Sequence, residues 1–293
     1  MKIFVTGAAG FMGQATMKLG ETLGHTMKGC DLVGKPDLNV VEGSITDLEF
    51  LKRETKGFDA IIHTASRHTG DMNAGVSNAE FYAVNVTGSD NVFLSALANG
   101  IEPVVFSSSL DIHCGTQWDA SGAIKYTEAL PDIPTSIYAV TKKMIEDMGH
   151  FYARSHGIRF CALRFSSVSN TFQAPQALRP VPLISRDLVV EDCAMANIQG
   201  CESDRVCDDV LLIGPHCPLE NADLIEAFKD RDAVIEKHWP GSLELFERAG
   251  FSTSGVLWPC CDIRRARQVL GWEPQYGYGW LLEKVKNGLT ASD

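Results

Sequence analysis

The amino-acid sequence predicts an α/β fold: a doubly wound parallel sheet with a smaller C-terminal α/β lobe. Through the first half of the 293 residues, short apolar segments alternate with helix-like segments, which is typical of a parallel sheet with crossover helices. A glycine-rich turn follows the first apolar segment directly. The length fits one α/β domain with an added lobe, and a hydrophobic content of 45% supplies a full core.

The expected strands are short apolar runs, such as the buried D-A-I-I-H and E-P-V-V-F-S segments. In chain order they are Lys2–Thr6, Thr26–Asp31, Leu38–Glu42, Asp59–His63, Glu102–Ser107, Ile158–Leu163 and Val206–Ile213. The expected helices have apolar residues at helical spacing, and Gly24 fits the end of the first one. They are Gln14–Leu23, Asp47–Lys56, Asn78–Asn99, Thr135–His156, Asp192–Cys201, Ser242–Ala249 and Asp262–Leu270.

The alternation changes near residue 165. Pro175, Pro180 and Pro182 indicate a loop, and shorter helices follow it. We therefore expect a nucleotide-binding domain over residues 1–165 and a smaller substrate-binding lobe over residues 166–293, with some exchange of strands and helices between them.

Charge and hydropathy restrict the partners. The net charge of -11 argues against nucleic acid and anionic membrane as main partners. The apolar stretch Ile3–Val5 is too short for a secretory core, and no run approaches the ~20 apolar residues of a membrane span. We expect a cytoplasmic protein with a small-molecule, carbohydrate-like substrate. A homodimer is one assembly that the sequence allows.

The nine cysteines are odd in number and contain no C-x-x-C pair. Most lie within apolar segments, so we interpret them as buried thiols rather than disulfides or metal ligands. The vicinal pair Cys260-Cys261 leaves a redox role open. No cluster of His, Cys and Asp has metal-ligand spacing, so we expect no metal.

The turn Thr6–Gly13 contains Gly7, Gly10 and Gly13 between a strand and a helix. Such glycines permit a tight turn, close approach of a pyrophosphate to backbone N–H groups, and close packing of helix on strand. Asp31 lies eighteen residues past Gly13, at the end of the second strand. A carboxylate there can accept both adenosine ribose hydroxyls and would repel a 2′-phosphate, which favours NAD over NADP. Nearby Lys28 and Lys35 leave NADP open.

Tyr138 and Lys142 are four residues apart in a helix-like segment and so share one helix face. An ammonium beside a phenol favours phenolate, so we expect a lowered Tyr138 pKa and an acid/base group that works near neutral pH. A solvated helix face is the alternative for this pair. Ser109 follows a strand whose carboxyl end opens into the crevice where α/β sheets bind ligands, and it can hydrogen-bond a substrate oxygen.

In this order, the segments resemble the extended short-chain dehydrogenase/reductase family, the NAD-dependent epimerase/dehydratase group with a Rossmann fold, over nearly the whole chain. The resemblance rests on the glycine turn, Asp31 and several short segments. These segments are 62–66 (I-H-T-A-S), 85–91 (N-V-T-G-S-D-N), 106–109 (F-S-S-S), 138–142 (Y-A-V-T-K), 163–168 (L-R-F-S-S-V), 186–192 (R-D-L-V-V-E-D) and 270–274 (L-G-W-E-P).

The resemblance implies that Ser109, Tyr138 and Lys142 are catalytic, with Tyr138 moving the hydroxyl proton while hydride moves to or from the nicotinamide. It also implies NAD as cofactor. The implied cofactor-binding residues are Gly7, Gly10, Phe11, Met12, Gly13, Asp31, Ser44, Ile45, Thr64, Ala65, Asn85, Ser107, Tyr138, Lys142, Phe165 and Val168.

The chain departs from the family pattern at several positions. Ser44 replaces the usual aspartate near adenine, and Ser167 replaces an asparagine that often touches substrate. Leu110-Asp111 lacks the Asp-Glu pair that dehydratases use. Only seventeen residues, Ser169 to Ser185, precede Arg186, where nucleotide-sugar epimerases typically spend more chain. The length resembles small sugar or sugar-acid dehydrogenases and predicts a substrate without a nucleotide.

Candidate substrate residues follow the crevice-facing strands. Arg67 can hold a carboxylate in a bidentate fork, or pair with Asp71 on the surface. His113 can line the pocket, or be structural. Arg179 can close over an anion. The full set is Ser66, Arg67, His68, Asp111, His113, Ser167 and Arg179.

We therefore predict an NAD-dependent oxidoreductase that acts on a small sugar, sugar acid or polyol. An NAD-dependent sugar or nucleotide-sugar epimerase is the second hypothesis. A non-catalytic, dinucleotide-sensing protein is the third, and the Ser109, Tyr138 and Lys142 set argues against it.

Overall fold

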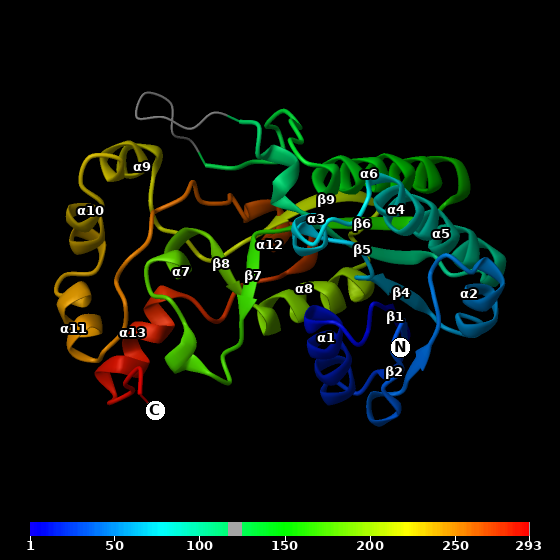
Figure 1. The fold of residues 1–293 in the computed structure, drawn as a ribbon, viewed down its shortest axis with the longest axis horizontal. Helices are drawn as coiled ribbons and strands as arrows, with labels where there is room; N and C mark the ends of the chain where they lie inside the picture. The colour runs from blue at the N-terminus through cyan, green and yellow to red at the C-terminus, as the bar shows by residue number, and fades with distance from the viewer. Residues whose placement is uncertain (117–124, 293) are drawn as a thin grey trace.

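A seven-stranded parallel sheet organises the protein, and this confirms the predicted fold class. The computed structural model describes residues 1–116 and 125–292 (Figure 1). The strand order is β3-β2-β1-β4-β5-β6-β9, so the chain reverses its direction of winding between β1 and β4. The strands are β1 (Lys2–Thr6), β2 (Thr26–Asp31), β3 (Val40–Glu42), β4 (Ala60–His63), β5 (Pro103–Ser109), β6 (Arg159–Phe165) and β9 (Asp208–Ile213).

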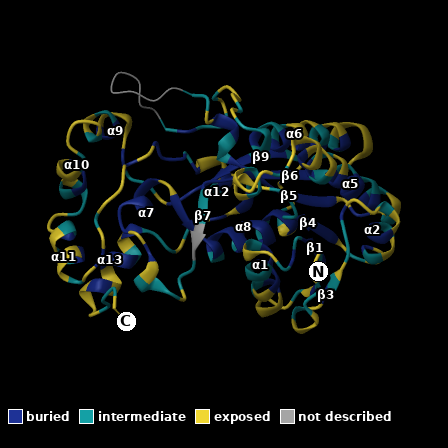
Figure 2. Ribbon diagram, in the orientation of Figure 1, coloured by how far each residue is buried: buried dark blue, intermediate teal, exposed yellow. Residues whose placement is uncertain are grey.

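Helices cover both faces of this sheet. On one face α1 (Phe11–Thr22) packs against α8 (Val190–Glu202), which lies over β4, β5 and β6 and also meets α12 (Arg264–Leu270). On the other face lie α2 (Leu48–Glu54), α5 (Gly88–Asn99) and α6 (Ile137–His156). Figure 2 shows β4, β5, β6 and α8 largely buried, whereas the outer faces of α5 and α6 are exposed.

The last third of the chain builds a second apolar cluster beside the sheet. Its helices are α7 (Pro182–Ser185), α9 (Asn221–Ala227), α10 (Arg231–His238), α11 (Ser242–Arg248) and α13 (Tyr278–Lys286), next to a two-stranded sheet of β7 (Ser167–Asn170) and β8 (Asp187–Val189). The buried Trp272 indole donates to the Asp192 carbonyl of α8 at 2.9 Å, and the Asp192 carboxylate accepts from the amide of Tyr276, which packs against the second cluster, at 3.1 Å. In the described part of the chain, no helix has the length and apolarity that crossing a membrane requires.

The predicted helix over Asn78–Asn99 is wrong in its middle. It divides into α4 (Asn78–Phe81), a π-helical turn (Tyr82–Thr87) and α5. The hydroxyl of Ser89, at the start of α5, donates to the carbonyl of Asn85 in this turn. The strand expected to end at Ser107 continues to Ser109, because it pairs with β6 through Phe165.

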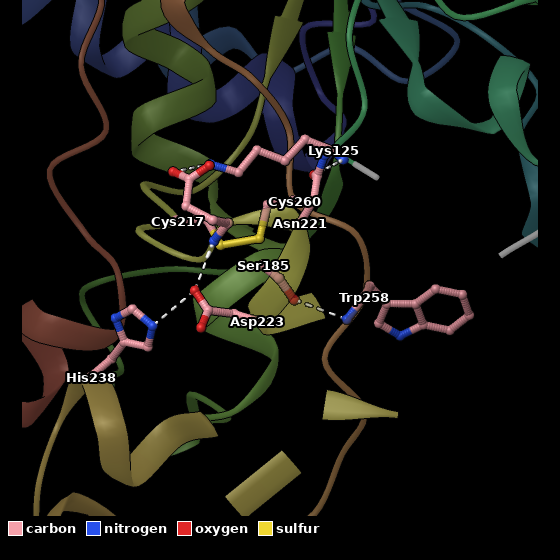
Figure 3. Close-up of a disulfide and its surroundings, with 9 residues drawn as sticks. Lys125, Ser185, Cys217, Asn221, Asp223, His238, Trp258 and Cys260 are labelled. Carbon is pink, nitrogen blue, oxygen red and sulfur yellow. Dashed lines mark hydrogen bonds and ion pairs between the residues drawn. A yellow bond between two sulfur atoms is a disulfide. The ribbon is translucent and has the colours of Figure 1, made fainter. Parts of the chain in front are cut away.

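The cysteines do not all remain thiols, which corrects the prediction. Cys217 and Cys260 form a disulfide with 6.1 Å between their Cα atoms (Figure 3). Their sequence separation of 43 residues gave no signal of the pairing, since the loop after β9 and the segment before α12 meet only in the folded protein. Cys261 stays a buried free thiol, so the vicinal cysteines are not bonded to each other.

Close packing of α6 on β6 depends on Gly149. A Cβ atom added there would lie 2.2 Å from Cζ of the buried Phe160 ring. We expect Gly149→Val to lower the free energy of unfolding by about 1–3 kcal/mol, because overpacking forces the ring or the helix to move. Urea denaturation measures this.

Gly279→Ala is the matched control. It lies within α13, where an added Cβ meets nothing within 4 Å. We expect this variant to gain up to about 1 kcal/mol from helix propensity. Equal stability of Gly149→Val and the wild type would contradict the packing account.

Candidate active site

A cleft of about 1030 Å³ lies along the carboxyl edge of the sheet. Parallel sheets bind ligands at this edge, where the chain reverses its winding. The ends of β1, β2, β4 and β5 form one side of the cleft, and residues 185–186 and 258–259 of the C-terminal region form the other.

The glycine turn fits an anionic phosphate group. Gly7 has a φ of +72°, and a Cβ there would lie 2.6 Å from the Ala65 amide nitrogen. A Cβ on Gly13 would lie 2.1 Å from the Gly7 carbonyl oxygen. Gly10 caps α1 without a side-chain hydrogen bond, and the first turn carries no acidic residue. The twelve-residue helix therefore presents uncapped N–H groups and the positive end of its dipole to the cleft.

Asp31, at the end of β2, lies beside the glycine turn. Its carboxylate accepts hydrogen bonds from the amides of Ala9 at 3.0 Å and Leu32 at 2.7 Å, which fix it beside the glycine turn. Each carboxylate oxygen keeps a further lone pair. Lys28, which left NADP open, is ion-paired with Glu54 at 2.9 Å and is not among the cleft-lining residues. The residues present thus fit a dinucleotide whose ribose carries free hydroxyls.

The three expected catalytic residues meet at the centre of the cleft. The Ser136 hydroxyl caps α6 by accepting from the Ala139 amide at 3.1 Å, which places Tyr138 in the first turn. The Lys142 Nζ lies 5.5 Å from the centroid of the Tyr138 ring. Ser109, at the end of β5, hydrogen-bonds the Tyr138 phenol.

The expected lowering of the Tyr138 pKa is wrong for this structure. Burial, and then the charge of Asp111, raise the pKa of the phenol, and the hydrogen bond from Ser109 only partly opposes them. Lys142 is itself affected, because burial lowers its pKa to about 7 against the opposing charge of Glu146. Its Nζ donates to the Ser107 carbonyl at 2.8 Å.

Asn85 positions the backbone beside the cleft instead of lining it. Its side chain accepts from the Arg67 amide at 2.7 Å and donates to the Arg67 carbonyl at 3.0 Å and to the Thr141 hydroxyl at 2.9 Å. The π-helical turn that carries Asn85 thereby ties the segment after β4 to α6. Arg67 extends its guanidinium to Asp71 at 3.1 Å, the alternative already considered from the sequence.

The structure brings most of the predicted site residues to the cleft. Those that line it are Gly7, Gly10, Phe11, Met12, Gly13, Asp31, Ser44, Ile45, Thr64, Ala65, Ser66, Arg67, His68, Ser107, Ser109, Asp111, Tyr138, Lys142, Phe165, Ser167 and Val168. Three others do not. Asn85 is buried as described, His113 is buried between Pro131 and Arg164, and Arg179 pairs with Asp187 at 2.7 Å.

Sequence reasoning missed two residues on the side of the cleft opposite the glycine turn. The Arg186 guanidinium lies 5.3 Å from the Trp258 ring centroid, and both side chains line the cleft. Within the described residues, no carboxylate pairs with Arg186. The Trp258 amide donates to the Ser185 hydroxyl at 3.1 Å, and Figure 3 shows the indole directed away from the disulfide. Arg186 lies in a segment that the sequence singled out, but nothing near Trp258 marks it.

A known protein family matches the part of the chain that forms most of the cleft. The sequence profile of the NAD dependent epimerase/dehydratase family matches residues 3–189. This match includes the glycine turn, Ser109, Tyr138 and Lys142.

Curated relatives differ in activity and in length. The UDP-glucose 4-epimerase of Halalkalibacterium halodurans is 28% identical over an alignment that covers 94% of this chain and 91% of that protein. The L-arabinose 1-dehydrogenase (NAD(P)(+)) of Haloferax volcanii is 30% identical over 56% of this chain and 65% of that protein. With the 3 beta-hydroxysteroid dehydrogenase/Delta 5-->4-isomerase of Mycobacterium tuberculosis, 28% identical, the match covers 57% of this chain and only about half, 47%, of that protein.

Solved structures share the fold. A short-chain dehydrogenase/reductase superfamily protein from Agrobacterium tumefaciens with bound NAD superimposes with a TM-score of 0.71 at 20% identity, covering 98% of this chain and 96% of that one.

The buried Lys142 gives stability a pH dependence. Its pKa is about 7 when folded and 10.5 as its ordinary value, so between these values the unfolded chain binds more protons. Stability should therefore rise with pH across this window. We expect Lys142→Met to stabilise the protein by up to a few kcal/mol below about pH 7, and this gain to shrink toward about pH 10.

Urea denaturation at several pH values measures the effect. Lys143→Met, on the next residue of α6 and ion-paired with Asp147, is the matched control. A gain for Lys142→Met that stays constant or grows with pH would show that burial does not lower the Lys142 pKa.

Proposed function

The chain belongs to the NAD-dependent epimerase/dehydratase family, and on this basis we propose that it is an NAD-dependent oxidoreductase acting on a small sugar, sugar acid or polyol through Ser109, Tyr138 and Lys142. One observation carries the proposal. Tyr138, hydrogen-bonded to Ser109 and next to Lys142, lies in the same cleft as a glycine cradle and Asp31. A proton-transfer group and a dinucleotide-binding turn are thus combined at one sheet edge.

In this proposal Tyr138 transfers the proton, and Lys142 and Ser109 assist it. Because the raised pKa keeps the Tyr138 phenol protonated at neutral pH, it is ready to donate to a carbonyl oxygen. In the opposite direction, the ammonium of Lys142 and the hydroxyl of Ser109 stabilise the phenolate that accepts the hydroxyl proton. Ser109 also holds the substrate oxygen. NAD, when bound, supplies the hydride acceptor or donor.

The substrate end supports a small polar substrate with an anionic group. Arg186 is a cleft-lining guanidinium without a carboxylate partner in the described residues, and it suits a carboxylate or a phosphate. Trp258 offers an aromatic face beside it, partly exposed to the cleft. The short segment from Ser169 to Ser185 adds only Arg179, which Asp187 engages. This favours a sugar acid over a nucleotide sugar.

A nucleotide-sugar epimerase is the second candidate. The epimerase of H. halodurans aligns with 94% of this chain, more than the arabinose dehydrogenase does. In that case Arg186 contacts a diphosphate.

A substrate screen separates the two. The protein is incubated with NAD+ and a panel of aldoses, uronates and polyols, and NADH absorbance is followed. Net NADH formation, fastest with an acidic sugar, is the expected result. Micromolar calorimetric binding of UDP or UDP-hexoses to the NAD-loaded protein, with no net NADH, would instead support the epimerase.

Tyr138→Phe tests the proton transfer. We expect kcat to fall on the order of 10²–10⁴-fold or more, with NAD binding nearly unchanged, because Phe keeps the ring but loses the oxygen. Steady-state kinetics on the best substrate of the screen measures this. Tyr152→Phe, on the same helix with its hydroxyl on Asp90, is the control. A near-normal kcat for Tyr138→Phe would rule out its assigned role.

Asp31→Ser tests the cofactor preference. The wild type should bind NAD+ more tightly than NADP+, and the variant should lose affinity for NAD+ and discriminate less, since a carboxylate binds ribose hydroxyls and repels a 2′-phosphate. Calorimetric titration with both dinucleotides measures the two affinities. Asp37→Ser, in the exposed turn after β2, serves as the control. Tighter binding of NADP+ by the wild type would contradict this role of Asp31.

A further inference from the structure

A buried carboxylate lies behind the three residues of the proposed function. Glu146 is one helical turn beyond Lys142 on α6, and only 1% of its surface is exposed. It does not line the cleft, so it contacts neither substrate nor cofactor. A buried carboxylate is expensive unless it is paired and hydrogen-bonded.

Glu146 joins the helix to the strand that carries Ser109. The Ser108 hydroxyl donates to Glu146 Oε1 at 2.6 Å. The flanking residues of the strand also contact α6, because the Ser107 carbonyl accepts from Lys142 and the Ser109 hydroxyl bonds Tyr138. Three successive residues at the end of β5 are thus held by three successive turns of α6.

Arg164 holds Glu146 from the neighbouring strand. It lies opposite Ser108 in the β5–β6 register, and its Nε and Nη2 donate to the two carboxylate oxygens of Glu146 at 2.9 Å and 2.6 Å. Its Nη1 donates to Asp132 Oδ1 at 2.7 Å and lies 2.8 Å from Nε2 of His113. The bidentate geometry fixes the carboxylate in one orientation.

We infer that Glu146, clamped by Arg164, is a positioning residue that fixes the end of β5, with Ser109 and the Ser107 carbonyl that holds Lys142, against α6. A role of Glu146 in catalysis rests on the proposed function, whereas its effect on the charge of Lys142 is independent of that function. Of the charges around Lys142, Glu146 is the one that opposes the lowering of its pKa by burial.

The groups around Lys142 come from each packed element. Its own helix supplies Tyr138 and Glu146, and β4 supplies His63, whose pKa burial lowers to about 3, so that it is neutral. In the turn after β5, the charge of Asp111 acts on Tyr138, and His113 lies against Arg164 of β6. The pKa of His113 is lowered by burial and by Arg164. No other carboxylate on α6 faces this cluster, since Asp147 is ion-paired with Lys143.

The test follows the charge of Lys142 directly. Lysines are labelled with ¹³C at Cε, and the Lys142 signal is identified by its absence in Lys142→Arg. We expect Glu146→Gln to move the Lys142 titration midpoint down by about 1 pH unit or more, because an adjacent opposite charge is lost. Asp147→Asn, the neighbouring carboxylate on the outer side of the helix, should leave the midpoint in place.

A second variant covers the case in which Glu146→Gln does not fold. Glu146→Met combined with Arg164→Met replaces the buried pair by apolar side chains, a change that folded proteins often tolerate. Loss of the Arg164 cation acts in the opposite direction, so the expected fall in the midpoint is smaller, and it persists because Glu146 is the charge that supports the Lys142 ammonium. An unchanged midpoint in the folded single variant, or in the double variant if the single one does not fold, overturns the inference.

The pH dependence of turnover gives a second readout, one that a general structural defect would not change. Since Lys142 acts as an ammonium, turnover of the wild type should fall as the pH rises through its pKa, and in Glu146→Gln this fall should occur at lower pH. A loss of kcat that is equal at every pH overturns the positioning role. The two failures can be distinguished. If the wild-type protein shows no oxidoreductase activity but Glu146→Gln still lowers the NMR midpoint of Lys142, the proposed function fails and the effect of Glu146 on Lys142 stands.

Discussion

The contact between the end of β5 and the first three turns of α6 determines where the reactive side chains lie. Ser109 bonds Tyr138, the Ser107 carbonyl accepts from Lys142, and Ser108 bonds Glu146. Strand and helix are 28 residues apart in sequence, from Ser109 to Ile137. Their alignment therefore depends on tertiary packing, including the close approach at Gly149 that brings α6 against β6.

Burial gives these groups their chemistry as well as their positions. Desolvation raises the pKa of Tyr138 and lowers that of Lys142, so both tend toward their neutral forms. Neighbouring polar groups limit this effect, since Ser109 stabilises the phenolate and Glu146 the ammonium. A buried lysine near its titration point destabilises the folded protein at neutral pH, and functional sites commonly retain such destabilising groups.

The two sides of the cleft have different origins. The cradle of Gly7, Gly13 and Asp31 is local, since all three lie between the end of β1 and the end of β2, within the turn, helix α1 and strand that follow β1. The opposite side of the cleft joins Arg186 to Trp258, a residue 72 positions further along the chain. Hydrogen bonds of the Trp258 amide to Ser185 and of the Tyr126 amide to the Cys260 carbonyl, together with the disulfide to Cys217, attach this distant segment to the cleft.

The sequence by itself determined the parallel α/β sheet, the glycine turn and Asp31, because each depends on local spacing and strand order, and the resemblance to the family added the Ser109, Tyr138 and Lys142 set. The tertiary structure alone decided that Asn85 and His113 are buried partners, that Arg179 is paired, and that Arg186 with Trp258 lines the cleft. It also decided the direction of the Tyr138 pKa shift and the Cys217–Cys260 bond. These features depend on which charges and segments pack together and how deeply they are buried, and neither quantity is encoded in the spacing of residues along the chain.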